Sequence, residues 1–73
     1  MKKEFENALK KGKVIKSQGF LTERGQYTIT LITYRRKIYF FKWIKDRIVE
    51  CADLSKMARE INNALNEEKK GGS

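Results

Sequence analysis

Histidine is absent from this 73-residue sequence, and Cys51 is its only cysteine. One thiolate cannot supply the four ligands of a structural zinc site, and a lone cysteine cannot form an internal disulfide. The sequence also lacks a Ser/His/Asp set, a Cys/His pair and a phosphate-binding glycine loop. We therefore expect a protein that binds and does not catalyse, with no metal and no cofactor. Cys51 is expected to be a small buried side chain in a reducing compartment.

Long apolar runs are missing as well. No stretch approaches the roughly 20 residues needed to cross a membrane. Met1, Lys2 and Lys3 lead into Glu4 without an apolar segment, so we expect no secretory signal. Together with the single cysteine, these absences predict a cytoplasmic protein with no membrane partner. Proline is absent too, and the abundance of Lys, Ile and Asn is typical of an AT-rich genome such as that of a phage or mobile element.

The length fits one small domain. We expect it to cover residues 1–70, with the Gly-Gly-Ser sequence of residues 71–73 as a flexible tail or an expression-related addition. A chain this short buries only about 60% of the surface that its unfolded form exposes, so its stability is marginal. Because neither a disulfide nor a metal site is available, oligomerisation or binding of a partner is the remaining source of extra stability.

Hydrophobic spacing predicts a helix followed by an antiparallel sheet. Phe5, Ala8 and Leu9 recur at helical spacing within residues 2–11, and Gly12 is placed to end that helix. The next segments are rich in β-branched and aromatic residues and are separated by turn residues. The predicted strands cover residues 14–22, with a bulge or bend at Gly19, and residues 26–34, 38–44 and 48–51.

The last helix has the clearest pattern. Asp53 is placed to accept hydrogen bonds from the first backbone amides of this helix. An apolar stripe at helical spacing follows and predicts packing against the core. Its members are Leu54, Met57, Ala58, Ile61, Ala64 and Leu65. The predicted fold class is therefore α+β: an N-terminal helix, a three- to four-stranded antiparallel meander, and a C-terminal helix packed on the sheet.

The net charge of +8 is concentrated in two segments. Residues 1–16 carry six lysines against two glutamates, and residues 35–47 carry six cations against Asp46 alone. The second segment interleaves its cations with aromatic residues, which is typical of nucleic-acid-binding proteins because cations neutralise phosphates and aromatic rings stack on bases. Protection of strand ends and solubility explain the same cations equally well, so both interpretations stay open.

The central functional prediction is one continuous cationic surface formed by the second segment. Its predicted nucleic-acid-binding residues are Arg35, Arg36, Lys37, Lys42, Lys45 and Arg47 for phosphates, with Tyr39 and Trp43 for bases. A secondary basic patch is predicted at Lys10, Lys11, Lys13 and Lys16. The expected function is that of a small accessory or regulatory module that binds nucleic acid, in first place DNA. As an alternative, the basic hairpin docks on an acidic surface of a partner protein, and a homodimer is compatible with both.

The loop length at residues 35–37 decides which aromatic residues share a face. With an even loop, one face carries Thr28, Thr30, Ile32, Tyr39, Phe41 and Trp43. With a three-residue loop, these three aromatic residues join Ile29 and Leu31 instead. The absence of glycine from the loop favours the even register, whereas Lys42, which the even register places among core-facing residues, favours the odd one.

Both faces of the third strand are apolar in either register, so a helix, a second subunit or a ligand must cover the second face. The position of the helices then separates two functions. If both helices pack on one side of the sheet, the aromatic residues of the other side form an open platform. If the helices lie on opposite sides, the aromatic residues are structural and only the cationic rim can bind.

Residues 26–65 place strands before a helix that carries the sequence LSKMAREINNAL. This order resembles the three-strand-plus-helix DNA-binding domains of the AP2 type, which are similar to domains at the N-termini of tyrosine recombinases. The resemblance implies a sheet that enters the major groove of DNA with the helix behind it. It rests on topology and basicity, and the helix predicted at residues 2–11 departs from it.

Overall fold

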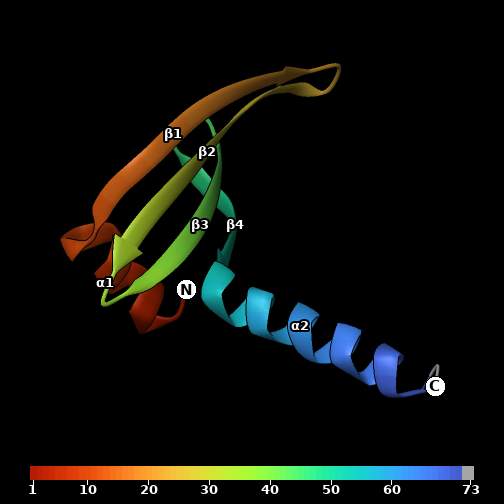
Figure 1. Cartoon of the computed structure of the whole chain (residues 1–73). Coiled ribbons are helices and arrows are strands. Elements are labelled where there is room, and N and C mark those ends of the chain that lie inside the picture. The colour runs from red at the N-terminus through yellow and green to blue at the C-terminus, as the bar shows by residue number, and fades with distance from the viewer. Residues whose placement is uncertain (72–73) are drawn as a thin grey trace.

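The computed structural model describes the backbone of residues 1–71 and the side chains of residues 1–66. Its elements are α1 (Lys3–Lys11), β1 (Lys13–Thr22), β2 (Gly25–Tyr34), β3 (Lys37–Ile44), β4 (Arg47–Asp53) and α2 (Leu54–Gly71), as Figure 1 shows. The predicted α+β architecture of helix, antiparallel meander and helix is confirmed. Gly72 and Ser73, most of the predicted tail, lie outside the described residues.

The four strands pair in chain order, β1-β2-β3-β4, and every pair is antiparallel. The bulge in β1 lies at Ile15, where the register shifts between Val14 and Lys16. Gly19 pairs regularly with Thr28, so the bulge predicted at Gly19 is wrong. Glycine indicates a bulge only weakly, and here Ile15 takes the extra position.

The hairpin between β2 and β3 has an even loop. Tyr34 pairs with Lys37, which leaves Arg35 and Arg36 as a two-residue turn. The even register is therefore confirmed, and it aligns Ile32 with Tyr39. Because paired residues point to the same side of a sheet, this register gathers the predicted set of threonine and aromatic side chains on one face.

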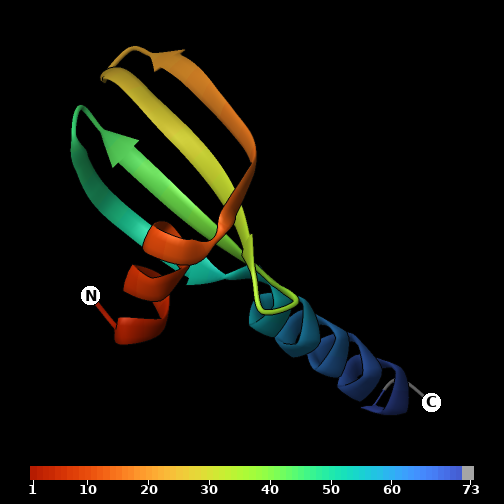
Figure 2. The same ribbon diagram turned by 90° about the vertical axis from the view of Figure 1, so that its left-hand side faces the viewer.

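That face, which we call the covered face, lies under α1 and holds the core. Phe41 and Ala8 are fully buried at 0% exposure, and Tyr39 and Ile32 are each 3% exposed. The ring of Phe5 on α1 meets the rings of Tyr39 and Phe41 edge-on, with centroid distances of 5.6 and 6.2 Å. Figure 2 shows α1 in front of the strands on this side. The helix thus buries the aromatic side of β3.

The opposite side of the sheet, the open face, is the side that the even register was expected to turn toward the core. Cross-strand pairing places seven large apolar residues on it: Phe20, Tyr27, Ile29, Leu31, Ile38, Phe40 and Ile44. All of them are exposed or half-buried, with Ile44 at 45% exposure. The core therefore formed on the other face, because α1 supplies its cover there.

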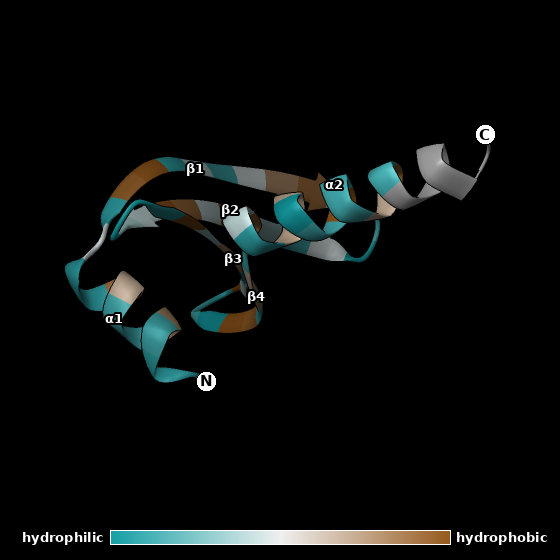
Figure 3. Ribbon diagram, turned by 60° about the horizontal axis from the view of Figure 1, so that its bottom comes forward, coloured by the Kyte–Doolittle hydropathy of each residue, from teal (hydrophilic) through white to brown (hydrophobic). Residues whose placement is uncertain are grey.

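The second helix begins as predicted. The Asp53 carboxylate accepts a hydrogen bond from the backbone N–H of Lys56 at 3.1 Å, and the Ser55 hydroxyl accepts one from the backbone N–H of Ile38 at 3.5 Å. Through this first turn α2 packs on β3 and β4. Beyond it, the helix projects away from the sheet (Figures 1 and 3).

The apolar stripe of α2 is therefore largely exposed, at 45% for Met57, 58% for Ile61 and 51% for Leu65. The prediction that this stripe packs in the core is wrong beyond the first turn. The radius of gyration is 15.3 Å, compared with about 11 Å for a compact domain of this length. Within the described residues, neither helix is long and apolar enough to cross a membrane.

Gly12 closes α1 and lets the chain pass against β2. A Cβ atom built at Gly12 collides with the carbonyl oxygen of Ala8 and with the side chain of Ile32. We expect Gly12→Ala to lower the free energy of unfolding by about 1–3 kcal/mol, because the overpacked backbone must shift. Chemical denaturation followed by circular dichroism measures this loss.

Gly19→Ala is the matched control, because its Cβ meets only the side-chain nitrogen of Gln26 at 3.8 Å. Gly19→Ala should leave the denaturant concentration at the unfolding midpoint unchanged or raise it slightly. Equal losses for the two variants would mean that the contact between Gly12 and β2 has no special role.

Candidate nucleic-acid interface

Two groups of cations that are distant in the sequence meet at one end of the sheet. Lys13, the first residue of β1, pairs with Thr33 near the end of β2. The turn of Arg35 and Arg36, which we call the arginine turn, begins two residues after Thr33. The close packing of Gly12 on Ile32 holds the end of α1 at the same place. We call this cluster the basic end, and its members are Lys10, Lys11, Lys13, Arg35 and Arg36. All five side chains are exposed.

The two arginines of the basic end have unusual backbone conformations. Arg35 has φ 51° and Arg36 has φ 64°, both in the left-handed region. Such a two-residue turn matches the twist of a hairpin, and Asn-Gly is the sequence that favours it. For a residue with a Cβ atom, this conformation costs roughly 1–2 kcal/mol. The Arg35 guanidinium lies over the ring of Tyr34, 5.4 Å from its centroid, which offsets a small part of that cost.

Lys37 differs from the two arginines because it has an acidic partner. Its Nζ lies 3.7 Å from Oδ2 of Asp53, a carboxylate with a side chain only 8% exposed. The same carboxylate caps α2 through Lys56. Lys37 therefore contributes less free positive charge to the basic end than its place in the sequence indicates.

Tyr39 lies in the core and offers no ring surface for a base. Its hydroxyl donates a hydrogen bond to Oε2 of Glu4 at 3.3 Å. Burial under α1, followed by the charge of Glu4, raises the pKa of Tyr39 above its usual value, so the phenol stays protonated and keeps this hydrogen bond. Trp43 is half-buried against the same core on the covered face. Neither ring therefore belongs to the basic end.

The remaining predicted cations lie elsewhere. Lys45 lies in the turn between β3 and β4, and Arg47 is the first residue of β4. Both are separated from the arginine turn by the length of β3, about 26 Å for eight residues. Lys42 lies between the two ends, on the open face, opposite Glu50 of β4. The expected single cationic surface is thus divided into two. The basic end instead joins the arginine turn to Lys10, Lys11 and Lys13 of the secondary patch, whereas Lys16 lies farther along β1, on the open face.

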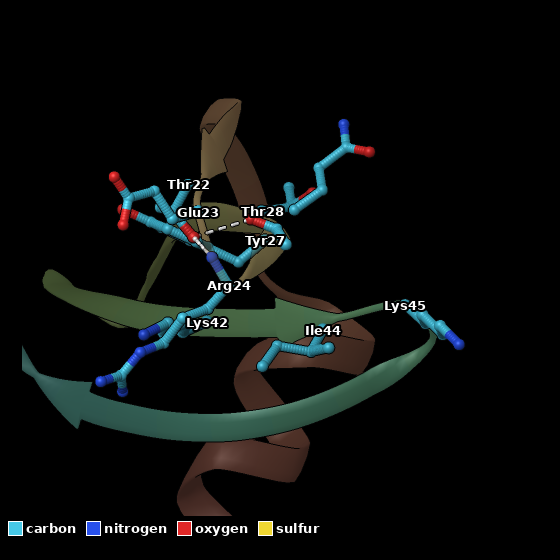
Figure 4. A pocket seen from close by; sticks show the side chains of 10 residues that line it. Thr22, Glu23, Arg24, Tyr27, Thr28, Lys42, Ile44 and Lys45 are labelled. Atoms are coloured by element: carbon cyan, nitrogen blue, oxygen red, sulfur yellow. Dashed lines mark hydrogen bonds between the residues drawn. The ribbon is translucent and has the colours of Figure 1, made fainter.

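The far end of the sheet holds a hollow of about 940 Å³, shown in Figure 4. Arg24, Lys42 and Lys45 line it together with Tyr27. The Lys42 ammonium lies 4.7 Å from the centroid of the Tyr27 ring, and the ring of Phe20 stacks on the same Tyr27 ring with a centroid distance of 5.1 Å. The turn beside it is held by a 2.8 Å hydrogen bond from the Thr22 hydroxyl to the carbonyl of Gly25.

No site role was predicted for Arg24, Phe20 or Tyr27. Their grouping at the far end depends on the pairing of β1 with β2, which the sequence alone does not give. Glu23 lines the same hollow, and Asp46 lies in the adjacent turn. The positive charge of the far end is therefore partly offset by acids. By contrast, the segments that form the basic end, residues 10–13 and 35–36, contain no acid.

Within the described part of the chain, no group of three or more His, Cys, Asp or Glu residues could hold a metal ion. Comparison with known families, curated proteins and solved structures finds no match to the chain. The course of α2 also differs from the AP2-type arrangement, in which the helix lies behind the sheet, because here α2 packs only by its first turn. The case for a function therefore depends on the geometry of the charged surfaces.

Proposed function

We propose that this protein is a small nucleic-acid-binding module, in first place for DNA, and that the basic end contacts the phosphate backbone. The observation that carries the proposal is the meeting of two cation groups, 22 or more residues apart in the sequence, at one end of the sheet. Phosphate contacts by lysine and arginine supply most of the affinity of such modules. The proposed role is binding without catalysis, in the cytoplasm, as an accessory or regulatory factor of a phage or mobile element.

The conformation of the arginine turn supports this role. Two arginines occupy positions where Asn-Gly would be more stable. Backbone strain of this kind concentrates at functional sites, where another benefit outweighs its cost. Here the benefit is the projection of two guanidinium groups from the tip of a hairpin, beside three lysines. Guanidinium groups match phosphate oxygens in a bidentate manner, which lysine cannot do.

The proposal predicts a steep salt dependence of DNA binding. Five phosphate contacts give a slope of log K against log salt concentration of about −4 to −5 on duplex DNA. Fluorescence anisotropy of a labelled duplex, titrated at several salt concentrations, measures this slope. Replacing Lys10 and Lys11 by glutamine should reduce its magnitude by about 2.

Lys45→Gln is the control, because Lys45 is an exposed cation in the turn between β3 and β4, at the other end of the sheet. It should change the slope by less than about 1. A slope near zero, or equal losses for the Lys45 and the Lys10/Lys11 variants, would contradict the proposal. In that case the alternative, an acidic surface of a partner protein, predicts a stoichiometric complex that survives nuclease treatment.

A further inference from the structure

The chain exposes far more surface than a compact monomer of its size. Its accessible surface is 6291 Å², whereas a folded monomer of 8.6 kDa exposes about 4,700 Å². The excess of about 1,600 Å² is twice the roughly 800 Å² that each partner contributes to an interface of standard size. The buried core, in contrast, holds only four apolar residues among those described. A monomer of this shape leaves much of its apolar surface without a partner.

Two surfaces hold much of the exposed apolar area, whereas Val14, Ile15, Leu21 and Val49 are exposed outside them. One is the stripe on α2, with Met57, Ile61 and Leu65 about half exposed. The other is the open face of the sheet, with Leu31 and Phe40 near its middle. Figure 1 shows that α2 and the hairpin of β1 and β2 project to the same side of the sheet, opposite α1. Apolar patches of this extent are rare on monomers and mark interaction sites.

The exposed stripe is shorter than the face. The helix from Met57 to Leu65 spans about 12 Å, and the eight residues of β3 span about 26 Å. A helix packed along the strands would therefore cover about half the length of the open face with its stripe. Its stripe would meet the apolar row of β2 and β3, and this row contains one lysine, Lys42, which has Glu50 as its cross-strand neighbour.

The helix cannot reach the open face of its own sheet. Asp53 is the last residue of β4, and Leu54 is the first of α2, so no linker separates them. The hydrogen bonds from Lys56 to Asp53 and from Ile38 to Ser55 fix the direction in which the helix leaves. Folding back would break both bonds and the first helical turn. A helix from another molecule has no such constraint.

We propose that two copies of this chain form a symmetric dimer in which the stripe of each α2 packs on the open face of the other copy. A two-fold axis lets each copy supply both a helix and a face, so both exposed surfaces are buried at once. The area suffices: burying half of the excess of about 1,600 Å² on each chain already gives an interface of standard size, about 1,600 Å² in total. A contact between the two helices alone would leave both open faces exposed.

Charge opposes this pairing only weakly. The open face carries Lys16 and Lys42 against Glu50, and the described charged residues of α2 are Lys56 and Arg59 against Glu60. The cations of the arginine turn and of Lys10 and Lys11 belong to a turn and to α1, outside the open face. The dimer therefore leaves most of the basic end accessible in each copy, and its existence does not depend on the proposed DNA binding.

Sedimentation equilibrium of the full chain tests the dimer. We expect twice the chain mass at micromolar concentration. Ile61→Glu should raise the dissociation constant at least about tenfold, because it places an unpaired charge in the centre of the interface. Asn63→Glu adds the same charge on the other side of the helix and should leave the constant unchanged. A monomer at high concentration, or equal effects of both variants, would overturn the proposal.

A mixing experiment tests the reciprocal arrangement. Ile44→Glu changes an exposed residue of the open face and should also dissociate the dimer. A mixture of the Ile61→Glu and Ile44→Glu proteins should regain dimer, because an intact helix then meets an intact face once in each pair. If Ile44→Glu has no effect, or if mixing restores nothing, the helix does not pack on the open face and the proposed dimer is wrong. Circular dichroism confirms that each variant is folded.

Discussion

Replacing Phe41 by alanine is expected to unfold much or all of the protein, whereas the same change at the preceding residue, Phe40, leaves it folded. Phe41 is fully buried under α1, in contact with Phe5. Loss of a buried phenylalanine costs about 3–5 kcal/mol. A domain of this size has a total stability of only about 4–11 kcal/mol. The Phe41 variant thus loses a large part of its stability or all of it.

Phe40 points to the open face and is only half-buried. Its replacement should cost about 1–2 kcal/mol, since less apolar surface returns to water. Thermal unfolding followed by circular dichroism, at a concentration where the chain is monomeric, compares the two variants without a contribution from the proposed dimer. The comparison also tests the register of β3: if Phe40→Ala is the more damaging change, the odd register holds and the two faces of the sheet are exchanged.

The order of elements could be predicted because each has a local signal. The spacing of Phe5, Ala8 and Leu9 indicated α1, and turn residues marked the ends of the strands. The Asp53 cap was predicted from one side chain and its position, and its hydrogen bond to Lys56 is present. Such features depend on residues close in the sequence, so the sequence alone determines them.

Which face of the sheet becomes the core could not be predicted in the same way. Both faces of β3 are apolar, and the choice depends on where α1 docks. The stripe on α2 shows the same limit. Its spacing correctly indicated a helix with one apolar side, yet periodicity cannot tell whether that side meets its own core or another molecule. Because no linker separates Asp53 from α2, the helix cannot turn back onto the open face of its own sheet.

The candidate site was predicted in its residue types more than in its arrangement. The arginine turn and the lysines of residues 10–13 were both selected from charge, but as a main and a secondary patch. The pairing of Lys13 with Thr33 joins them. The same pairing rules separate Lys45 and Arg47 from the arginine turn, because residues at the two ends of a strand are far apart however close they are in sequence.

The double variant Arg35→Asn/Arg36→Gly is expected to make the protein more stable and its DNA binding weaker. Both residues have positive φ angles, 51° and 64°, and Asn-Gly adopts this turn with little strain. Relief of strain should raise the free energy of unfolding by about 1–2 kcal/mol, after allowance for the lost contact of Arg35 with Tyr34. The change removes two of the five cations of the basic end.

The loss of two phosphate contacts should weaken binding to duplex DNA about tenfold or more at low salt and reduce the salt slope by about 2. Denaturant unfolding and anisotropy titrations, made on the same preparation, measure the two effects. Their opposite signs are informative, because a variant that merely misfolds would lose both stability and binding.

Lys45→Asn provides the matched control. Lys45 also has a positive φ angle, 55°, in a two-residue hairpin turn, but it lies at the far end of the sheet. Asparagine should relieve strain there in the same way, by about 0.5–1 kcal/mol. Its effect on DNA affinity should be within about twofold, since a single cation outside the interface contributes little at moderate salt. If Lys45→Asn weakens binding as much per charge as the double variant, the total charge of the chain governs binding and the basic end has no special part in it.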